Sequence, residues 1–158
     1  LLDIAPGGRW GAGDAHGAGE VVDLGCGSGV LAIAAHKLGF GPIRACDFDP
    51  LSVEATEVNA RLNDVLPVVS RVDLREGLPP LAPTVLANLM RPLLLEVCEK
   101  IAALPGGGGA DGPGIERMIL SGLLDEEADE ISAAYAALGL TERRRVDDGG
   151  WTGLLLTR

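Results

Sequence analysis

Hydrophobic residues in this chain gather in short runs that alternate with longer amphipathic segments. The runs end at Gly, Pro, Asn or Asp, which is typical of buried strands, whereas the segments between them repeat apolar residues at helical spacing. Strands are expected at 20–24, 43–47, 67–72, 84–88, 115–121, 140–146 and 151–157, and helices at 28–38, 51–62, about 91–103 and 125–138.

The order of these elements predicts the fold class. Strands that alternate with helices indicate a parallel sheet joined by right-handed crossovers. Pro67 lacks an N–H, so the third strand is expected near an edge. The turn residues 147–150 predict a closing hairpin, one strand of which runs antiparallel to the rest. We therefore expect an α/β fold, a Rossmann-like seven-stranded sheet, mostly parallel with a C-terminal antiparallel hairpin, and helices on both faces.

Composition bounds the class of protein. With 158 residues and 47% apolar content, the chain is expected to form one ordered domain. No apolar run is long enough to span a bilayer, which takes about 20 residues, and residues 1–19 lack the basic segment followed by an apolar one that is typical of a signal peptide. The chain begins at Leu1 rather than Met. We therefore expect 1–19 to be the end of a helix plus a Gly-rich loop at a fragment start, and 20–158 to be the folded domain.

The net charge and the number of cysteines limit the classes of binding partner that the chain is expected to have. The formal net charge of −10 argues against binding to nucleic-acid phosphates and is compatible with a basic protein partner, or simply with solubility. No membrane partner is expected. Cys26, Cys46 and Cys98 are too few and too scattered for a disulfide framework or a metal site. Reduced thiols in the cytoplasm, with no metal, are the expectation.

A glycine-rich turn between the first strand and the first helix is the strongest local signal. Gly25, Gly27 and Gly29 follow an apolar run that contains Asp23. Such a turn lets a nucleotide-like ligand approach the backbone at a helix N-terminus, because glycine has no Cβ. A glycine-rich connection without a ligand is the alternative.

The spacing of these glycines separates the possible ligands. A dinucleotide fingerprint needs Gly or Ala where this chain has Val30, and no Lys-Ser/Thr pair follows, as a nucleoside-triphosphate loop would require. Gly-x-Gly-x-Gly after an acidic strand end is instead the pattern of S-adenosylmethionine-dependent methyltransferases. Asp23 would order the backbone of the loop or face the positively charged methionine amino group.

Two further residues end strands at the same edge of the expected sheet. Asp47 follows the second strand and can accept hydrogen bonds from both ribose hydroxyls of an adenosine cofactor. It could instead cap the next helix, although Asp49 before Pro50 already suits that role. Asn88 ends the fourth strand, where its amide can position a neutral substrate amine for methyl transfer. Capping of the following helix is the alternative for Asn88, and both roles are compatible.

These motifs together resemble a known family. Segments 22–35, 46–50, 87–89 and 121–124, with Gly150-Trp151 near the end, look like the PrmA-type ribosomal protein methyltransferases. The resemblance implies a methyltransferase that transfers methyl groups from S-adenosylmethionine to amines of a basic ribosomal protein, L eleven. It extends from about residue 20 to the C-terminus, so it implies that 20–158 is a methyltransferase catalytic domain.

The resemblance also implies roles for individual residues. Asn88 would lie at the junction of cofactor and substrate as the catalytic residue, Asp73 would contact the adenine amino group, and Trp151 would serve packing. The cofactor-binding set is Asp23, Gly25, Cys26, Gly27, Gly29, Asp47, Phe48, Asp73 and Asn88.

The sequence departs from the family before the first strand. Family members carry an N-terminal substrate-recruiting domain and a Gly-Thr-Gly-x-His motif, which Gly11–His16 echoes too close to the first strand to match. Three alternatives therefore stay open: a methyltransferase of another protein or a small molecule, a non-catalytic cofactor-binding module, and a dehydrogenase, which Val30 disfavours.

Overall fold

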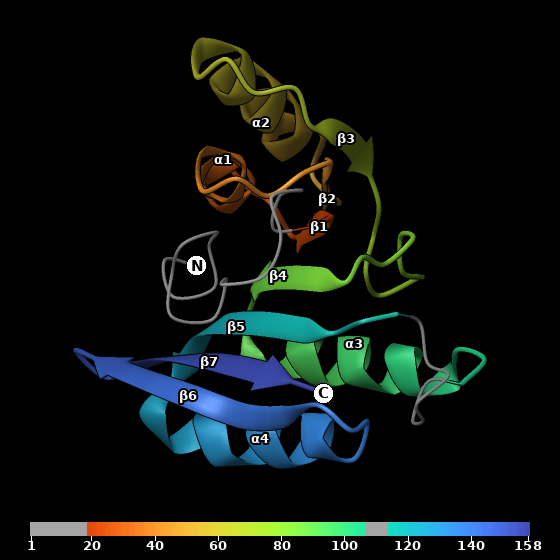
Figure 1. Cartoon of the computed structure of the whole chain (residues 1–158), viewed down its shortest axis with the longest axis vertical. Coiled ribbons are helices and arrows are strands. Elements are labelled where there is room, and N and C mark those ends of the chain that lie inside the picture. Colours follow the sequence, from red (N-terminus) through yellow and green to blue (C-terminus); the bar gives the residue numbers. More distant parts are fainter. Residues whose placement is uncertain (1–18, 107–113) are drawn as a thin grey trace.

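Seven strands form one sheet in the computed structural model, which describes residues 19–106 and 114–158 (Figure 1). Their order is β3-β2-β1-β4-β5-β7-β6; β1 to β5 are parallel, and β7 runs antiparallel to both neighbours. The expected sheet, its closing hairpin and the edge position of the third strand are confirmed. The strands are β1 (Val21–Leu24), β2 (Ile43–Asp47), β3 (Val68–Arg71), β4 (Thr84–Asn88), β5 (Arg117–Leu124), β6 (Thr141–Asp148) and β7 (Trp151–Thr157).

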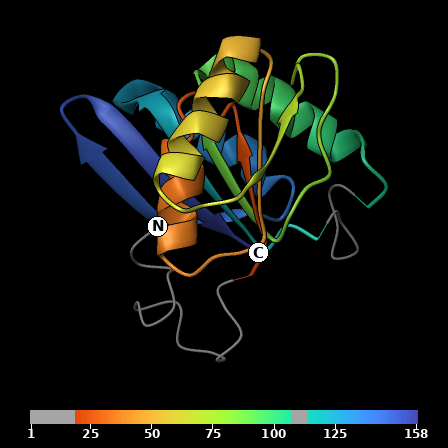
Figure 2. The same ribbon diagram turned by 90° about the horizontal axis from the view of Figure 1, so that it is seen from above.

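Helices cover both faces of the sheet, as expected (Figures 1 and 2). The helices are α1 (Val30–Lys37), α2 (Pro50–Leu62), α3 (Arg91–Ala103) and α4 (Ala128–Ala136), the last preceded by a 3₁₀ turn at Asp125–Glu127. The first helix begins two residues later than expected, because Gly29 has φ 81° and lies at the N-cap. None of the helices in the described ranges is long and apolar enough to cross a membrane.

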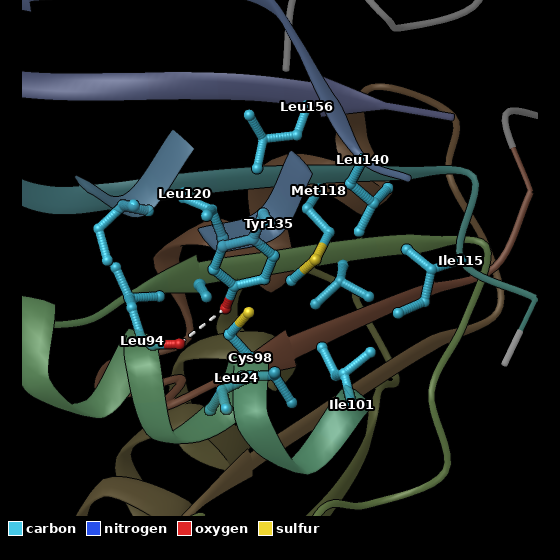
Figure 3. Close-up of a cluster of buried hydrophobic side chains, with 14 of the residues drawn as sticks. Leu24, Leu94, Cys98, Ile101, Ile115, Met118, Leu120, Tyr135, Leu140 and Leu156 are labelled. Carbon is cyan, nitrogen blue, oxygen red and sulfur yellow. Dashed lines mark hydrogen bonds between the residues drawn. The ribbon is translucent and has the colours of Figure 1, made fainter. Parts of the chain in front are cut away.

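The larger part of the core lies between the sheet and the helices α3 and α4 (Figure 3). Tyr135 of α4 is fully buried there, and its hydroxyl donates a 2.9 Å hydrogen bond to the carbonyl of Leu94 in α3. The bond lets a polar side chain fill the core without a desolvated, unpaired hydroxyl. The buried apolar residues of the same cluster include Leu24, Cys98, Ile101, Ile115, Met118, Leu120, Leu140 and Leu156.

The side chains of β1 point alternately to the two faces of the sheet, and this places Asp23 on the face covered by α1. Val22 and Leu24 belong to the core beneath α3 and α4, whereas Val21 belongs to the smaller core beneath α1. Successive side chains of a strand point to opposite faces, so Asp23 shares the α1 face with Val21. The carboxylate therefore lies under the helix that follows the glycine turn.

The fifth strand differs from the expectation. It runs to Leu124 rather than ending at residue 121, and its pairing with β7 shifts register between Leu120 and Leu123. Gly122 lies in this irregularity with φ 82°. Glycine is unfavourable inside a regular strand, so the sequence predicted that the strand ends before Gly122. A β-bulge accommodates glycine, and the strand continues after it.

Several sequence expectations fall outside the described residues. These are the helix end at 1–5, most of the loop at 9–19 with its His-containing echo, and most of the Gly-rich segment at 106–114.

Candidate functional site

The glycine turn after β1 is held by the end of β2. The amides of Gly25 and Cys26 both donate to the Cys46 carbonyl, at 2.8 and 2.9 Å. Gly25, Gly27 and Gly29 have φ of 71°, 54° and 81°, conformations that other residues adopt only with strain. The three glycines predicted from the sequence are thus required by the backbone path.

Asp23 lies beneath this turn and supports the start of α1. Its Oδ2 accepts a 3.0 Å hydrogen bond from the amide of Ala32 in the first turn of α1. The N-cap residue Gly29 has no side chain for that purpose, so a carboxylate from β1 supplies the missing acceptor. Asp23 Oδ1 is buried and has no partner. The pKa of Asp23 is raised to about 7. Burial raises it most, the hydrogen bond from the Ala32 amide lowers it, and the nearby charge of Asp47 raises it.

This raised pKa predicts a pH-dependent stability. Between pH 4 and 7 the folded protein retains a proton on Asp23 that the unfolded chain has lost, so the free energy of unfolding should fall as pH rises through this window. Asp23→Asn cannot ionise but keeps an acceptor for Ala32. Urea titrations at pH 5, 6, 7 and 8 should therefore show that the free energy of unfolding falls less with rising pH in the variant than in the wild type. Parallel pH curves would contradict the raised pKa.

Asp47 joins the glycine turn to the start of α2. Its Oδ2 accepts from the Gly27 amide and its Oδ1 from the Asp49 amide, both at 3.0 Å. The cap of α2 is Asp49, which accepts from the Leu51 amide at 3.0 Å. Asp49, rather than Asp47, therefore caps α2, and the Asp47 carboxylate lines a pocket.

That pocket, of about 310 Å³, opens at the carboxyl ends of β1, β2 and β4. On its wall, Asp73 is chelated by the Arg75 guanidinium at 2.9 and 2.7 Å, which lowers the pKa of Asp73 to about 2. The same guanidinium lies 5.3 Å from the centre of the Phe48 ring. The lining residues are Gly25, Asp47, Phe48, Val72, Asp73, Leu74, Arg75, Leu89, Met90, Pro92, Leu93 and Glu96.

Asn88 lines a second, more open groove of about 690 Å³. Its Oδ1 accepts a 3.1 Å hydrogen bond from the Ser121 hydroxyl of β5, which fixes the orientation of the amide. It does not cap α3, whose N-cap is Met90 without a side-chain bond, so that alternative is wrong. Leu89 and Met90 line both cavities, which therefore adjoin at these two residues.

Gly122 makes this arrangement possible and received no role from the sequence. A Cβ at this position would lie 2.8 Å from the Leu89 carbonyl oxygen and 2.9 Å from Asn88 Oδ1. Either contact is too close for real atoms, and the backbone carbonyl cannot rotate away as a side chain could. Gly122 therefore lets β5 pack directly against the residues at the end of β4.

Gly122→Ala should lower the free energy of unfolding more than a glycine substitution without a clash. Gly139→Ala is the matched control, since Gly139 has a similar φ of 77° and open space around it. Positive φ alone should cost each variant about 1–2 kcal/mol. Urea unfolding should show an additional loss of about 1 kcal/mol or more for Gly122→Ala. Equal losses in the two variants would mean that the β5–β4 contact relaxes freely.

Two sequence expectations change at the level of side chains. Trp151 was assigned to packing, but it is 57% exposed and lines the groove beside Asn88, so that assignment is wrong. Cys26 is buried and lines neither cavity; its sulfur lies 3.2 Å from the Thr56 hydroxyl oxygen. Burial raises the pKa of Cys26 to about 11, so its thiol is protonated at neutral pH.

The donor set suits an organic ligand better than a metal. Across residues 19–106 and 114–158, no three His, Cys, Asp or Glu side chains are grouped to hold an ion. The first cavity instead combines the Asp47 and Asp73 carboxylates with the Phe48 ring and aliphatic walls. Carboxylates accept hydrogen bonds from hydroxyl and amino groups, and a ring offers stacking. A nucleoside fits this chemistry.

Comparison with known proteins agrees with this geometry. The family model for ribosomal protein L11 methyltransferase (PrmA) matches residues 12–158. A ribosomal protein L11 methyltransferase from Ectopseudomonas mendocina (strain ymp) is 39% identical over 131 residues, covering 82% of this chain and 42% of the relative. One from Cupriavidus necator is 40% identical over 145 residues, covering 87% and 43%. The chain thus spans less than half the length of these curated relatives.

Solved structures give the same result. A ribosomal protein L11 methylase from Lactobacillus delbrueckii subsp. bulgaricus superposes with a TM-score of 0.74 at 31% identity, covering 89% of this chain and 70% of that one. A putative RNA methyltransferase from Pyrococcus horikoshii, at 18% identity and a TM-score of 0.67, shares the fold. With the family model matching most of its length, the chain belongs to the ribosomal protein L11 methyltransferase (PrmA) family.

Proposed function

We propose that this chain is the catalytic domain of an S-adenosylmethionine-dependent N-methyltransferase that acts on amines of a protein, with ribosomal protein L11 as the substrate. The observation that supports it most is the shared wall at Leu89 and Met90. Both the nucleoside-sized pocket and the groove lined by Asn88 include these two residues, so the two cavities adjoin there. A methyl donor in the pocket and a methyl acceptor in the groove would meet beside Leu89 and Met90.

The first pocket would hold the cofactor, which supplies a methyl group on a sulfonium. Asp47 would accept from the ribose hydroxyls, since it is ionisable, nearly buried and part of the wall. Asp73 would accept from the adenine amino group, and its low pKa keeps it an acceptor at any physiological pH. Gly25 would let the ligand approach the backbone. Asp23, which lies beneath the turn and lines neither cavity, would serve the cofactor by ordering the backbone at the start of α1.

The groove would hold the side chain or chain end that bears the amine. Trp151 and Met90 are exposed apolar surfaces along it, and Asp148 adds a carboxylate. A lysine has an apolar stem and a cationic head, so it suits such a lining. Asn88 would then hold the deprotonated amine by accepting from its N–H, which orients the nitrogen lone pair for in-line transfer.

A ribosomal protein substrate agrees with the charge of this chain. The net charge of −10 attracts a basic partner over long range. Ribosomal proteins are made in the cytoplasm, so the proposed reaction takes place there. The relatives that share this substrate in their name are more than twice as long as the matched region, and their remaining segments could contribute to recruitment.

The decisive experiment separates cofactor from substrate. Titration calorimetry with S-adenosylmethionine tests the pocket, and mass spectrometry of purified ribosomal protein L11 after incubation with cofactor and enzyme tests the transfer. A chimera that joins this chain to the upstream part of the Ectopseudomonas mendocina relative serves as a second enzyme form. Methylated L11 with either form supports the proposal.

Two results would contradict it. Cofactor binding without transfer to L11 by either form would exclude this substrate and favour another protein or a small molecule. Absence of S-adenosylmethionine binding, together with enhanced NADH fluorescence on mixing, would favour a dehydrogenase.

A further inference from the structure

The inner face of α2 contacts the glycine turn at three consecutive residues. The Thr56 hydroxyl, fully buried, lies 3.0 Å from the Gly27 carbonyl oxygen. One helical turn on, the side-chain amide of Asn59 donates a 2.9 Å hydrogen bond to the Ser28 carbonyl. A Cβ on Gly29 would lie 2.9 Å from the Thr56 methyl group. Neither Thr56 nor Asn59 lines either cavity, and the two lie about 30 residues from the turn in sequence.

These bonds set the orientation of two peptide units. In a trans peptide the N–H points opposite to the C=O, so a Gly27 carbonyl held by Thr56 directs the Ser28 N–H away from α2. The next peptide, between Ser28 and Gly29, is held at both of its polar groups. Its carbonyl accepts from Asn59, and its N–H donates to the Cys26 carbonyl at 2.7 Å. Glycines on both sides of Ser28 make alternative peptide orientations accessible. The turn therefore needs an external restraint to stay in one conformation.

The restraint also reaches the carboxylate of the pocket. Asp47 bonds both the Gly27 amide of the turn and the Asp49 amide that begins α2. The turn, Asp47 and α2 thus form a closed ring of contacts. Movement of the turn relative to α2 would displace Gly27 from Asp47 and change the shape of the pocket at the position proposed for the ribose.

We propose that Thr56 and Asn59 are positioning residues that hold the glycine turn in its cofactor-binding conformation. The inference rests on the proposed use of the turn for S-adenosylmethionine. Preorganisation of a loop improves affinity because less order remains to be imposed on binding. Loss of the restraint should weaken binding of the cofactor and its product while the sheet stays intact.

The chain supplies a matched pair of variants for the test. Asn59→Asp keeps the size of the side chain but removes the donor to Ser28. Asn63→Asp removes a similar 2.9 Å amide bond, to the Asn59 carbonyl, and adds the same charge to the same helix away from the turn. S-adenosylhomocysteine, which lacks the sulfonium charge, is the titrant. Asn59→Asp should raise its Kd about tenfold, and Asn63→Asp less than about twofold.

Hydrogen–deuterium exchange of the ligand-free protein is the second measurement. Exchange should accelerate in peptides that cover 25–31 in Asn59→Asp, with β4 unchanged and with no such change in Asn63→Asp. Thr56→Val should act like Asn59→Asp, whereas Thr56→Ser keeps the hydroxyl and should exchange like the wild type. Equal affinity in the wild type and Asn59→Asp, equal weakening in both aspartate variants, or faster exchange everywhere would overturn the inference.

The two proposals fail separately in this design. A wild-type chain that binds no S-adenosylhomocysteine would contradict the proposed function. The exchange rates of the turn would still decide whether α2 restrains it.

Discussion

Replacing Asp47 by alanine should raise the Kd for S-adenosylmethionine at least about 100-fold. A hydrogen bond to a charged group contributes about 1.5–3 kcal/mol, and two ribose hydroxyls can bond this one carboxylate. Even at the lower limit the sum of about 3 kcal/mol corresponds to about two orders of magnitude in Kd. Titration calorimetry at fixed salt measures the change directly. The loss of the Gly27 contact adds to the effect, because Asp47 also holds the turn.

Asp49→Ala is the control for this experiment. It removes a neighbouring carboxylate whose hydrogen bond goes to the Leu51 amide, so it should lower stability by about 1 kcal/mol and leave the cofactor affinity nearly unchanged. Thermal unfolding of both variants separates misfolding from weakened binding. An Asp47→Ala variant that folds and binds with wild-type affinity would refute the ribose assignment.

Asn88→Ala should lower the rate of methyl transfer about 100-fold while changing the Kd for the cofactor less than about threefold. Its side chain lines the groove rather than the cofactor pocket, and Ser121 holds it in one orientation. Misplacing a reacting group by about 1 Å can lower a rate by two orders of magnitude. Single-turnover transfer to L11, together with calorimetry of the cofactor, gives the two quantities.

Asn63→Ala provides the comparison for Asn88. It removes the asparagine at the C-cap of α2, whose side chain bonds the Asn59 carbonyl of that helix, so both rate and affinity should remain near wild type. Equal losses of affinity and rate in Asn88→Ala would instead identify Asn88 as a cofactor-binding residue. A rate that does not fall would remove Asn88 from the proposed mechanism.

The strand order explains why residues so distant in sequence share one site. The sheet reverses direction of growth at β1 and β4, so the loops that follow these two strands diverge and leave a crevice between them. Gly25 follows one strand and Asn88 ends the other. The β7 insertion between β5 and β6 then extends the crevice toward Trp151.

Much of the fold and part of the site were predictable from local pattern. Strand ends and glycines are local features, so the turn, Asp47 and Asn88 could be assigned to one edge of the sheet before any contact was known. Asp73, which lines the pocket, does not end a strand and was assigned from the family resemblance instead. The ion pair of Asp73 with Arg75 and its contact to Phe48 did not follow, since both depend on how a loop folds back.

The α/β class, the alternation of strands and helices, the glycine turn and the acidic and amide residues that end β2 and β4 all follow from the sequence alone. They are features of short segments, which the period of the hydrophobic residues and the backbone freedom of glycine are enough to predict. Three features became visible only in the folded structure: Gly122 has no room for a side chain, Trp151 is exposed in the groove, and α2 contacts the turn. Each of these depends on a contact between elements far apart in the chain, and side-chain packing and strand register, rather than local preference, determine which atoms meet there.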